Sequence, residues 1–228
     1  MSGNNWTVNR EVPAVKLLMT GFSPFGGESM NPAWEAVRRL PDRLGEWTLV
    51  KREIPTSFAG CAAALEEACR EHRPDAVLCV GQAGGRACVT VERVAVNLAE
   101  ASIPDNDGAQ PVDQPLVPGG PAAYFATLPV KAMVRRVRAA GVPSQLSYTA
   151  GTYVCNCAMY RALHLAAEAY PGMRAGFIHV PYAPRQALDK PGATPTMSLE
   201  DISRALAAAA EAIAEGREDS GANMGTTH

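Results

Sequence analysis

The sequence predicts a single α/β domain with helices on both faces of a largely parallel, mixed sheet. Two observations carry this prediction. Short apolar runs alternate with helical patterns along most of the chain, which is typical of strand-helix-strand units. The chain has 228 residues and no internal repeat, and that length is enough for one full hydrophobic core. We expect the domain at residues 15–215, after an N-terminal extension at 1–14 and before a disordered tail at 216–228.

The first third of the chain contains three apolar runs and two helical patterns. VKLLMTGF at 15–22 is almost wholly apolar and is predicted as a strand. The Asn-Pro pair at 31–32 should begin a helix, because asparagine caps free N–H groups and proline suits the first turn. We expect a strand at 47–54, an alanine-rich helix at 57–72 and a buried strand at 75–81.

The middle of the chain combines an extended run with a long polar loop. VTVERVAVNL at 89–98 is predicted as extended. The segment from Glu100 to Gly120 is crowded with Pro, Gly and Asp, and a loop of that length in a compact domain is usually functional or disordered. Pro121 and Pro129 could each begin a helical segment.

The last third of the chain returns to alternation. We expect a strand at 146–150, a helix at 156–170 and a strand at 175–182, and Ser198 begins a capping-box pattern that opens the last helix. Sheets of this class bind ligands at the carboxyl ends of their strands. Three chemically capable residues fall at or near such ends: Cys155, His179 and Glu92.

Composition and charge argue against several classes of partner. The formal net charge is -2, so nothing favours binding to nucleic acid or to an anionic membrane. The polar N-terminus lacks the apolar stretch of a secretory signal, and no run is long and apolar enough to span a bilayer. The six cysteines do not form a disulfide framework in a chain of this size. We therefore expect a cytoplasmic protein.

Two cysteines, Cys155 and Cys157, stand one residue apart at the start of a predicted helix. Free N–H groups and the dipole at a helix N-terminus favour a thiolate, which lowers the thiol pKa, and they can also hold an oxyanion. A helical wheel turns Cys155 toward the sheet and places Cys157 on a water-facing polar stripe with Arg161, His164 and Glu168. Cys155 is thus the candidate nucleophile, although either cysteine could instead be a small core residue.

His179 and Glu92 are the candidate partners of this thiol. His179 ends an apolar strand and is the candidate general base, with a buried core histidine as the alternative. Glu92 stands on an otherwise apolar strand face, where it could orient an imidazole or form a salt bridge with an arginine. No second cysteine pair, HExxH or C-x-x-C motif occurs, so we expect no metal and no cofactor.

Two glycine-rich turns follow predicted strands. MTGFSPFGG places Phe22 and Phe25 after the first strand, where they could anchor the loop or form an aromatic wall for a small, uncharged group. CVGQAGGR lacks the spacing of a phosphate-binding loop, and its Gln82 could present a neutral amide to a neutral substrate.

Taken together, these segments resemble the pyroglutamyl-peptidase I family of cysteine peptidases. The resemblance rests on TGFSPFGG with the following Asn-Pro, GQAGGR with VTVERVAVN, IPDNDGAQP, AGTYVCN and FIHVPY. These blocks occur in the family order and span roughly residues 15–182.

The resemblance implies a fold, an activity and a set of site residues. It implies a three-layer α/β/α fold, a homotetramer, and an exopeptidase that removes N-terminal pyroglutamate from peptides. Carried over by motif, the triad is Cys155, His179 and Glu92, with Arg93 as a further candidate at the oxyanion. The pocket for the substrate ring maps to Phe22, Phe25, Asn31, Gln82, Tyr153 and Val154. Tyr153 departs from the phenylalanine that is common in the family, and the loop from Glu100 to Gly120 could cover the site.

Other activities stay open at this point. A thiol amidohydrolase acting on another small cyclic or acyl amide could use the same three residues. A non-catalytic binding module should lack at least one of them, and all three are present. A nucleoside phosphorylase-like activity would need a phosphate site, for which the sequence offers no convincing motif.

Overall fold

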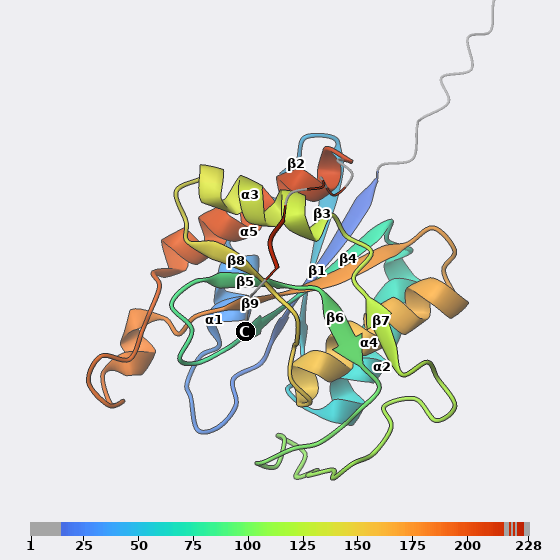
Figure 1. Cartoon of the computed structure of the whole chain (residues 1–228), viewed down its shortest axis with the longest axis horizontal. Helices are drawn as coiled ribbons and strands as arrows, with labels where there is room; N and C mark the ends of the chain where they lie inside the picture. The colour runs from blue at the N-terminus through green and yellow to red at the C-terminus, as the bar shows by residue number, and fades with distance from the viewer. Residues whose placement is uncertain (1–14, 217–218, 220, 222, 226–228) are drawn as a thin grey trace, which may run out of the picture.

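A seven-stranded sheet forms the centre of the molecule, in the order β2-β3-β1-β4-β9-β5-β8 (Figure 1). The computed structural model of the chain describes residues 15–216, 219, 221 and 223–225. The strands of this sheet are β1 (Lys16–Phe22), β2 (Arg43–Leu44), β3 (Trp47–Ile54), β4 (Ala76–Gln82), β5 (Val89–Glu92), β8 (Ser144–Ser147) and β9 (Arg174–Val180).

The sheet is mostly parallel, with one reversal that matters for the site. Strands β3, β1, β4 and β9 run parallel to one another. Strand β5 pairs antiparallel with β9, and β8 pairs parallel with β5, so these two strands run opposite to the central four. Strand β2 is antiparallel to β3. The predicted α/β class with a largely parallel, mixed sheet is confirmed.

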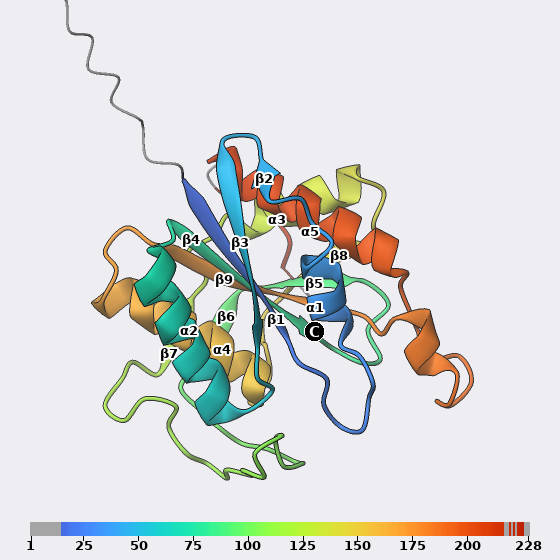
Figure 2. The same cartoon turned by 180° about the vertical axis from the view of Figure 1, so that it is seen from behind.

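Helices cover both faces of the sheet (Figures 1 and 2). One face carries α1 (Pro32–Val37), α3 (Val130–Ala139) and α5 (Leu199–Ala214), and the other carries α2 (Phe58–His72) and α4 (Val154–Glu168). A short 3-10 helix, η1, spans Pro184–Ala187. The close approach of α1 to β1 requires Gly21, because a Cβ there would lie 2.5 Å from the Trp34 Cα.

The predicted helix starts agree with the observed caps. The side chains of Asn31, Ser57 and Ser198 each accept a hydrogen bond from a backbone N–H in the first turn of α1, α2 and α5. Proline at the first position of α1 also stands where the sequence placed it. These starts were predictable because capping depends on neighbouring residues alone.

Several predicted elements were wrong or displaced. No helix begins at Pro121, because residues 123–125 form β7 (Ala123–Phe125), which pairs with β6 (Val94–Val96). The predicted run at 89–98 breaks at Arg93, where the chain leaves the main sheet for this second, two-stranded sheet. The predicted strand at 146–150 lies at 144–147, and α4 begins at Val154, two residues before the predicted start.

The predicted extension at 1–14 lies outside the described residues, as does part of the predicted tail. Within the tail, the Asp219 carboxylate accepts a hydrogen bond of 2.7 Å from the Lys131 N–H in the first turn of α3. Among the helices that the structure describes, none combines the length and the apolar character needed to cross a bilayer.

Candidate active site

Cys155 is the second residue of α4 and lies directly over the sheet. The N-cap of α4, Tyr153, makes no side-chain cap hydrogen bond, so the first N–H groups of this helix have no partner within it. A Cβ at Gly81 of β4 would lie 2.8 Å from the Cys155 Sγ and 2.7 Å from the Phe177 ring. The thiol therefore occupies the space that the missing side chain of Gly81 leaves.

His179 reaches the same point from the neighbouring strand. In the β4–β9 register its Cα pairs with that of Gly81, so both residues face the α4 side of the sheet. The imidazole is only 4% exposed and packs 4.8 Å from the Phe177 ring. Cys155 and His179 thus both adjoin Gly81.

Glu92 completes the cluster from β5. Its Oε1 atom lies 2.8 Å from the Nδ1 atom of His179, and its side chain is fully buried. The antiparallel pairing of β5 with β9 sets Thr90 opposite His179 and Glu92 opposite Phe177, so that all four side chains face the same way. The prediction placed the site at the carboxyl ends of parallel strands. That rule does not apply to Glu92, because β5 runs antiparallel to β9.

Glu92 both contacts an imidazole and forms a salt bridge with an arginine, the two roles that the sequence left open. Its Oε1 atom also accepts a hydrogen bond of 2.7 Å from Nη1 of Arg86 and one of 3.1 Å from the Thr90 hydroxyl. Arg86 also donates to the Thr90 hydroxyl. Three donors therefore converge on one carboxylate oxygen and fix its direction toward the imidazole. Arg86 was missed as a partner because the sequence does not reveal which arginine lies near Glu92.

The electrostatics favour a neutral thiol beside a neutral imidazole. Burial, and then the charge of Glu92, raise the pKa of Cys155 to about 12. The predicted lowering of this pKa is therefore wrong, because desolvation and the nearby carboxylate both disfavour the thiolate. Burial also lowers the pKa of His179 below its ordinary value, although Glu92 opposes that shift.

Glu92 keeps its negative charge in this setting. Burial alone would raise the pKa of Glu92, but hydrogen bonds, first to His179 and then to Ser147 and Arg86, lower it overall. A carboxylate can only accept at the Nδ1 atom of His179, so Nδ1 carries the proton and Nε2 is left as the basic nitrogen. The arrangement can take a proton from a thiol and hold the resulting imidazolium, as an acyl-transfer triad requires.

Cys157 does not face water, so its predicted place on the water-facing polar stripe was wrong. Its side chain is 3% exposed, and its Sγ atom lies 3.8 Å from that of Cys61 in α2. Arg161 forms an ion pair with Glu66 of α2. The helical wheel gave the relative directions of these side chains, but it could not reveal that α2 packs against this face.

Two further polar residues have partners that the sequence did not reveal. His164 is not a free surface residue, because its Nδ1 atom lies 3.0 Å from the Tyr124 hydroxyl and its ring stacks on Tyr160. Arg93 lies over the Phe125 ring and 3.9 Å from Asp219. These contacts hold the guanidinium at the second sheet and the C-terminal segment.

Aromatic rings form one wall beside Cys155. The Tyr153 ring lies 6.4 Å from Phe25 and meets Phe58 edge-on at 5.6 Å. The Tyr153 hydroxyl donates to the Pro104 carbonyl, which ties the wall to the long loop. Phe22 is the last residue of β1, and it is buried 6.4 Å from Phe177 beneath the site.

The other predicted pocket residues have structural partners of their own. Asn31 caps α1 and donates to the Ser23 carbonyl. Val154 is fully buried. The Gln82 side-chain oxygen accepts a hydrogen bond of 2.8 Å from Gln186, which the sequence reasoning missed.

Two missed residues hold the active-site segments in place. The side chain of Asn156, next to the nucleophile, bonds the backbone N–H and carbonyl of Val96 and so ties α4 to β6. Asp105 accepts from the Phe58 N–H at the start of α2 and from the Asp107 N–H within its own loop. The PDNDG sequence is typical of such a turn, but it does not reveal the contact with α2.

Comparisons with known proteins agree with this geometry. The profile of a family described as pyroglutamyl peptidase matches residues 15–216. A pyrrolidone-carboxylate peptidase of Levilactobacillus brevis is 56% identical over 199 residues, covering 87% of this chain and 97% of the relative. One of Enterococcus faecalis is 52% identical over 214 residues, covering 94% and 100%.

Solved structures give the same result. The crystal structure of pyroglutamyl peptidase I from Bacillus amyloliquefaciens superimposes with a TM-score of 0.89 at 47% identity, covering 92% of this chain and 99% of that one. The pyrrolidone carboxyl peptidase of Thermococcus litoralis superimposes with a TM-score of 0.87 at 39% identity, with the same coverage of 92% and 99%.

Proposed function

This chain belongs to the pyroglutamyl peptidase family, and on that premise we propose that it is a cysteine exopeptidase acting on peptides with an N-terminal pyroglutamyl residue. It hydrolyses the amide bond that follows this residue. One observation carries the proposal at the level of residues. Cys155 and His179 both adjoin Gly81, and the Nδ1 atom of that imidazole lies 2.8 Å from Glu92.

The reaction begins with a proton transfer inside the site. As the Cys155 sulfur attacks the pyroglutamyl carbonyl, Nε2 of His179 takes the thiol proton, and Glu92 stabilises the imidazolium. Because the pKa of the thiol is raised to about 12, this transfer accompanies the attack and does not precede it as a stable ion pair. The free N–H groups at the start of α4 hold the oxyanion.

The second half of the reaction uses the same imidazole. The imidazolium gives its proton to the leaving amine, which departs and leaves a thioester on Cys155. Neutral His179 then activates a water molecule that hydrolyses the thioester. No step requires a metal or a cofactor.

Substrate selection follows from the neutral lactam ring. The Phe25 and Tyr153 rings form an uncharged wall for it, with Phe22 packed beneath. The loop from Glu100 to Gly120 contacts this wall through the Pro104 carbonyl. Hydrogen bonds to the lactam N–H and C=O select pyroglutamate over proline, which lacks the ring carbonyl and would leave a donor unpaired.

Assembly and compartment complete the proposal. A homotetramer is supported by the family resemblance and by large apolar side chains left exposed on the single chain, among them Val112, Phe125 and Leu188. Light scattering should then give four times the chain mass. A cytoplasmic location is supported by six cysteines that are all free thiols, which a reducing compartment maintains.

The decisive experiment measures the release of a fluorescent amine from a pyroglutamyl amide under reducing conditions. We expect activity in the wild type and in Cys157→Ser, no activity in Cys155→Ser, and little release from the matching prolyl amide. A folded, reduced wild type that is inert on the pyroglutamyl amide would overturn the proposal. Activity on a different small amide would then point to another thiol amidohydrolase.

A further inference from the structure

A second pair of thiols lies next to the active site, between α2 and α4. Among the six cysteines, all within the described residues, Cys61 and Cys157 are the pair whose sulfurs are in contact, at 3.8 Å. Both sulfurs also point at the same backbone oxygen, that of Phe58, at 3.5 and 3.6 Å. The proposed reaction uses neither thiol.

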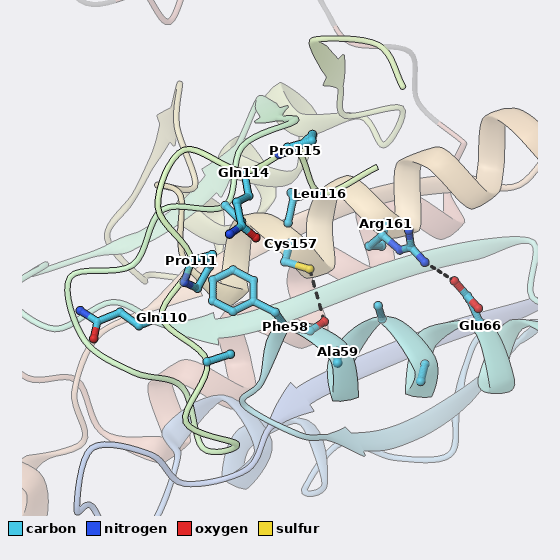
Figure 3. A pocket seen from close by; sticks show the side chains of 14 residues that line it. Phe58, Ala59, Glu66, Gln110, Pro111, Gln114, Pro115, Leu116, Cys157 and Arg161 are labelled. Carbon is cyan, nitrogen blue, oxygen red and sulfur yellow. Dashed lines mark hydrogen bonds and ion pairs between the residues drawn. The ribbon is translucent and has the colours of Figure 1, made fainter. Parts of the chain in front are cut away.

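A groove gives small molecules a route to this pair. It has a volume of about 610 Å³ and is lined by α2, α4 and the loop at 109–116. Figure 3 shows Cys157 at its floor, with the sulfur directed at the Phe58 carbonyl, while Gln110 and Gln114 line the loop side. This volume lies within the range of small-ligand sites.

The lining suits a small polar disulfide better than an apolar ligand. The Gln110 and Gln114 amides can bond to peptide groups, and Arg161, paired with Glu66, stands at the far end (Figure 3). We propose that Cys61 and Cys157 form a dithiol modification site, at which a small polar disulfide of the glutathione type attaches to Cys157 and the pair then closes an intrachain disulfide.

The chemistry needs one disulfide as the oxidant and releases two thiols. The Cys157 thiolate attacks one sulfur of the small disulfide, which forms a mixed disulfide and expels one small thiolate. The Cys61 thiolate then attacks the Cys157 sulfur, forms the intrachain bond and expels the second small thiolate. The protons of the two protein thiols pass to these leaving groups.

The contacts also explain the order of the two steps. Cys157 lines the groove and meets the small disulfide first, whereas Cys61 is fully buried behind it. The hydrogen bond to Cys157, followed by burial, raises the pKa of Cys61 well above its usual range. Modification of Cys157 removes that hydrogen bond and so favours the second attack. The sulfurs must then approach from 3.8 Å to a disulfide bond length of about 2.05 Å.

The test exposes the full-length protein to oxidised glutathione and maps its disulfides under non-reducing conditions. In Cys155→Ala, which lacks the nucleophile, we expect a peptide pair that links Cys61 to Cys157. Adding Cys61→Ser should stop the reaction at one glutathione on Cys157, and adding Cys157→Ser should abolish both products. We expect the same linkage in the wild type, so this outcome does not depend on the folding of any variant.

A second readout follows from the span of the bridge. Its ends lie 96 residues apart in the sequence, so closing it constrains the unfolded chain. We expect the oxidised protein to have a higher Tm and dithiothreitol to reverse the increase. Variants that lack Cys61 or Cys157 should show no increase. Glutathione found only on other cysteines, or retained on Cys157 while Cys61 is present, would overturn the proposal, as would two unmodified thiols in the folded protein.

Discussion

Replacing Glu92 by glutamine removes the charge of the triad carboxylate and keeps its shape. Arg86 and Thr90 both donate to Oε1, so they should hold the glutamine oxygen in the same place. That oxygen can still accept from Nδ1 of His179, and the tautomer of the imidazole is retained. The substitution therefore isolates the charge from the geometry.

The expected loss follows from the distance between the two groups. Opposite unit charges 2.8 to about 4 Å apart, at an effective dielectric constant of about 20, attract each other by about 4–6 kcal/mol. This attraction stabilises the imidazolium, which forms only during the reaction. We therefore expect kcat to fall by about 10³–10⁴-fold, with a much smaller change in KM.

A separate cost falls on stability. The buried Oε2 atom of Glu92 has no hydrogen-bond partner among the described residues, so a glutamine NH₂ group in its place would be unsatisfied. Such a group costs about 1–3 kcal/mol, which urea unfolding would measure independently of the kinetics.

The assay is amide hydrolysis over a range of pH, with Thr90→Val as the matched control. Thr90→Val removes one hydrogen bond to the same Oε1 atom but leaves the charge, so we expect a loss of less than about tenfold. Glu92 raises the pKa of His179, so removing its charge should move the acidic limb of the rate profile to lower pH. A folded Glu92→Gln variant within tenfold of the wild-type kcat would refute the reasoning.

Four further predictions concern the nucleophile and its surroundings. Iodoacetamide should alkylate Cys155 slowly at neutral pH and faster as the pH rises, because the thiol pKa is raised to about 12. Rapid alkylation that does not change between pH 5 and 9 would instead show a preformed thiolate. Hydrolysis, by contrast, needs neutral His179, whose pKa lies below its ordinary value, so activity should persist below pH ~6.5 before it declines. Gly81→Ala should lower kcat by at least about 10²-fold with the fold retained, because its Cβ would lie 2.8 Å from the Cys155 Sγ. The control is Gly192→Ala, because Gly192 has open space around it. Equal activities of the two variants would contradict the placement of the Cys155 thiol over Gly81. Tyr153→Phe keeps the ring and loses one hydrogen bond, so thermal or urea unfolding should show a loss of about 0.5–1.5 kcal/mol without a change in the preference for pyroglutamyl over prolyl amides.

Local sequence was enough to predict the starts of α1, α2 and α5 and two members of the candidate triad. Asn31, Ser57 and Ser198 cap helices through neighbouring N–H groups, and such contacts depend only on adjacent residues. Cys155 at a helix start and His179 near a strand end follow from the same kind of pattern.

Only the tertiary structure decided which of these side chains meet. Glu92 reaches His179 because β5 runs antiparallel to β9, and Arg86 joins it from a turn whose direction the sequence does not reveal. Cys157 is buried because α2 lies over it, and burial together with the charge of Glu92 raises the pKa of Cys155. Capping and periodicity act within a few residues, so one sequence can reveal them. Pairing, burial and charge contacts join distant segments and depend on how the chain packs.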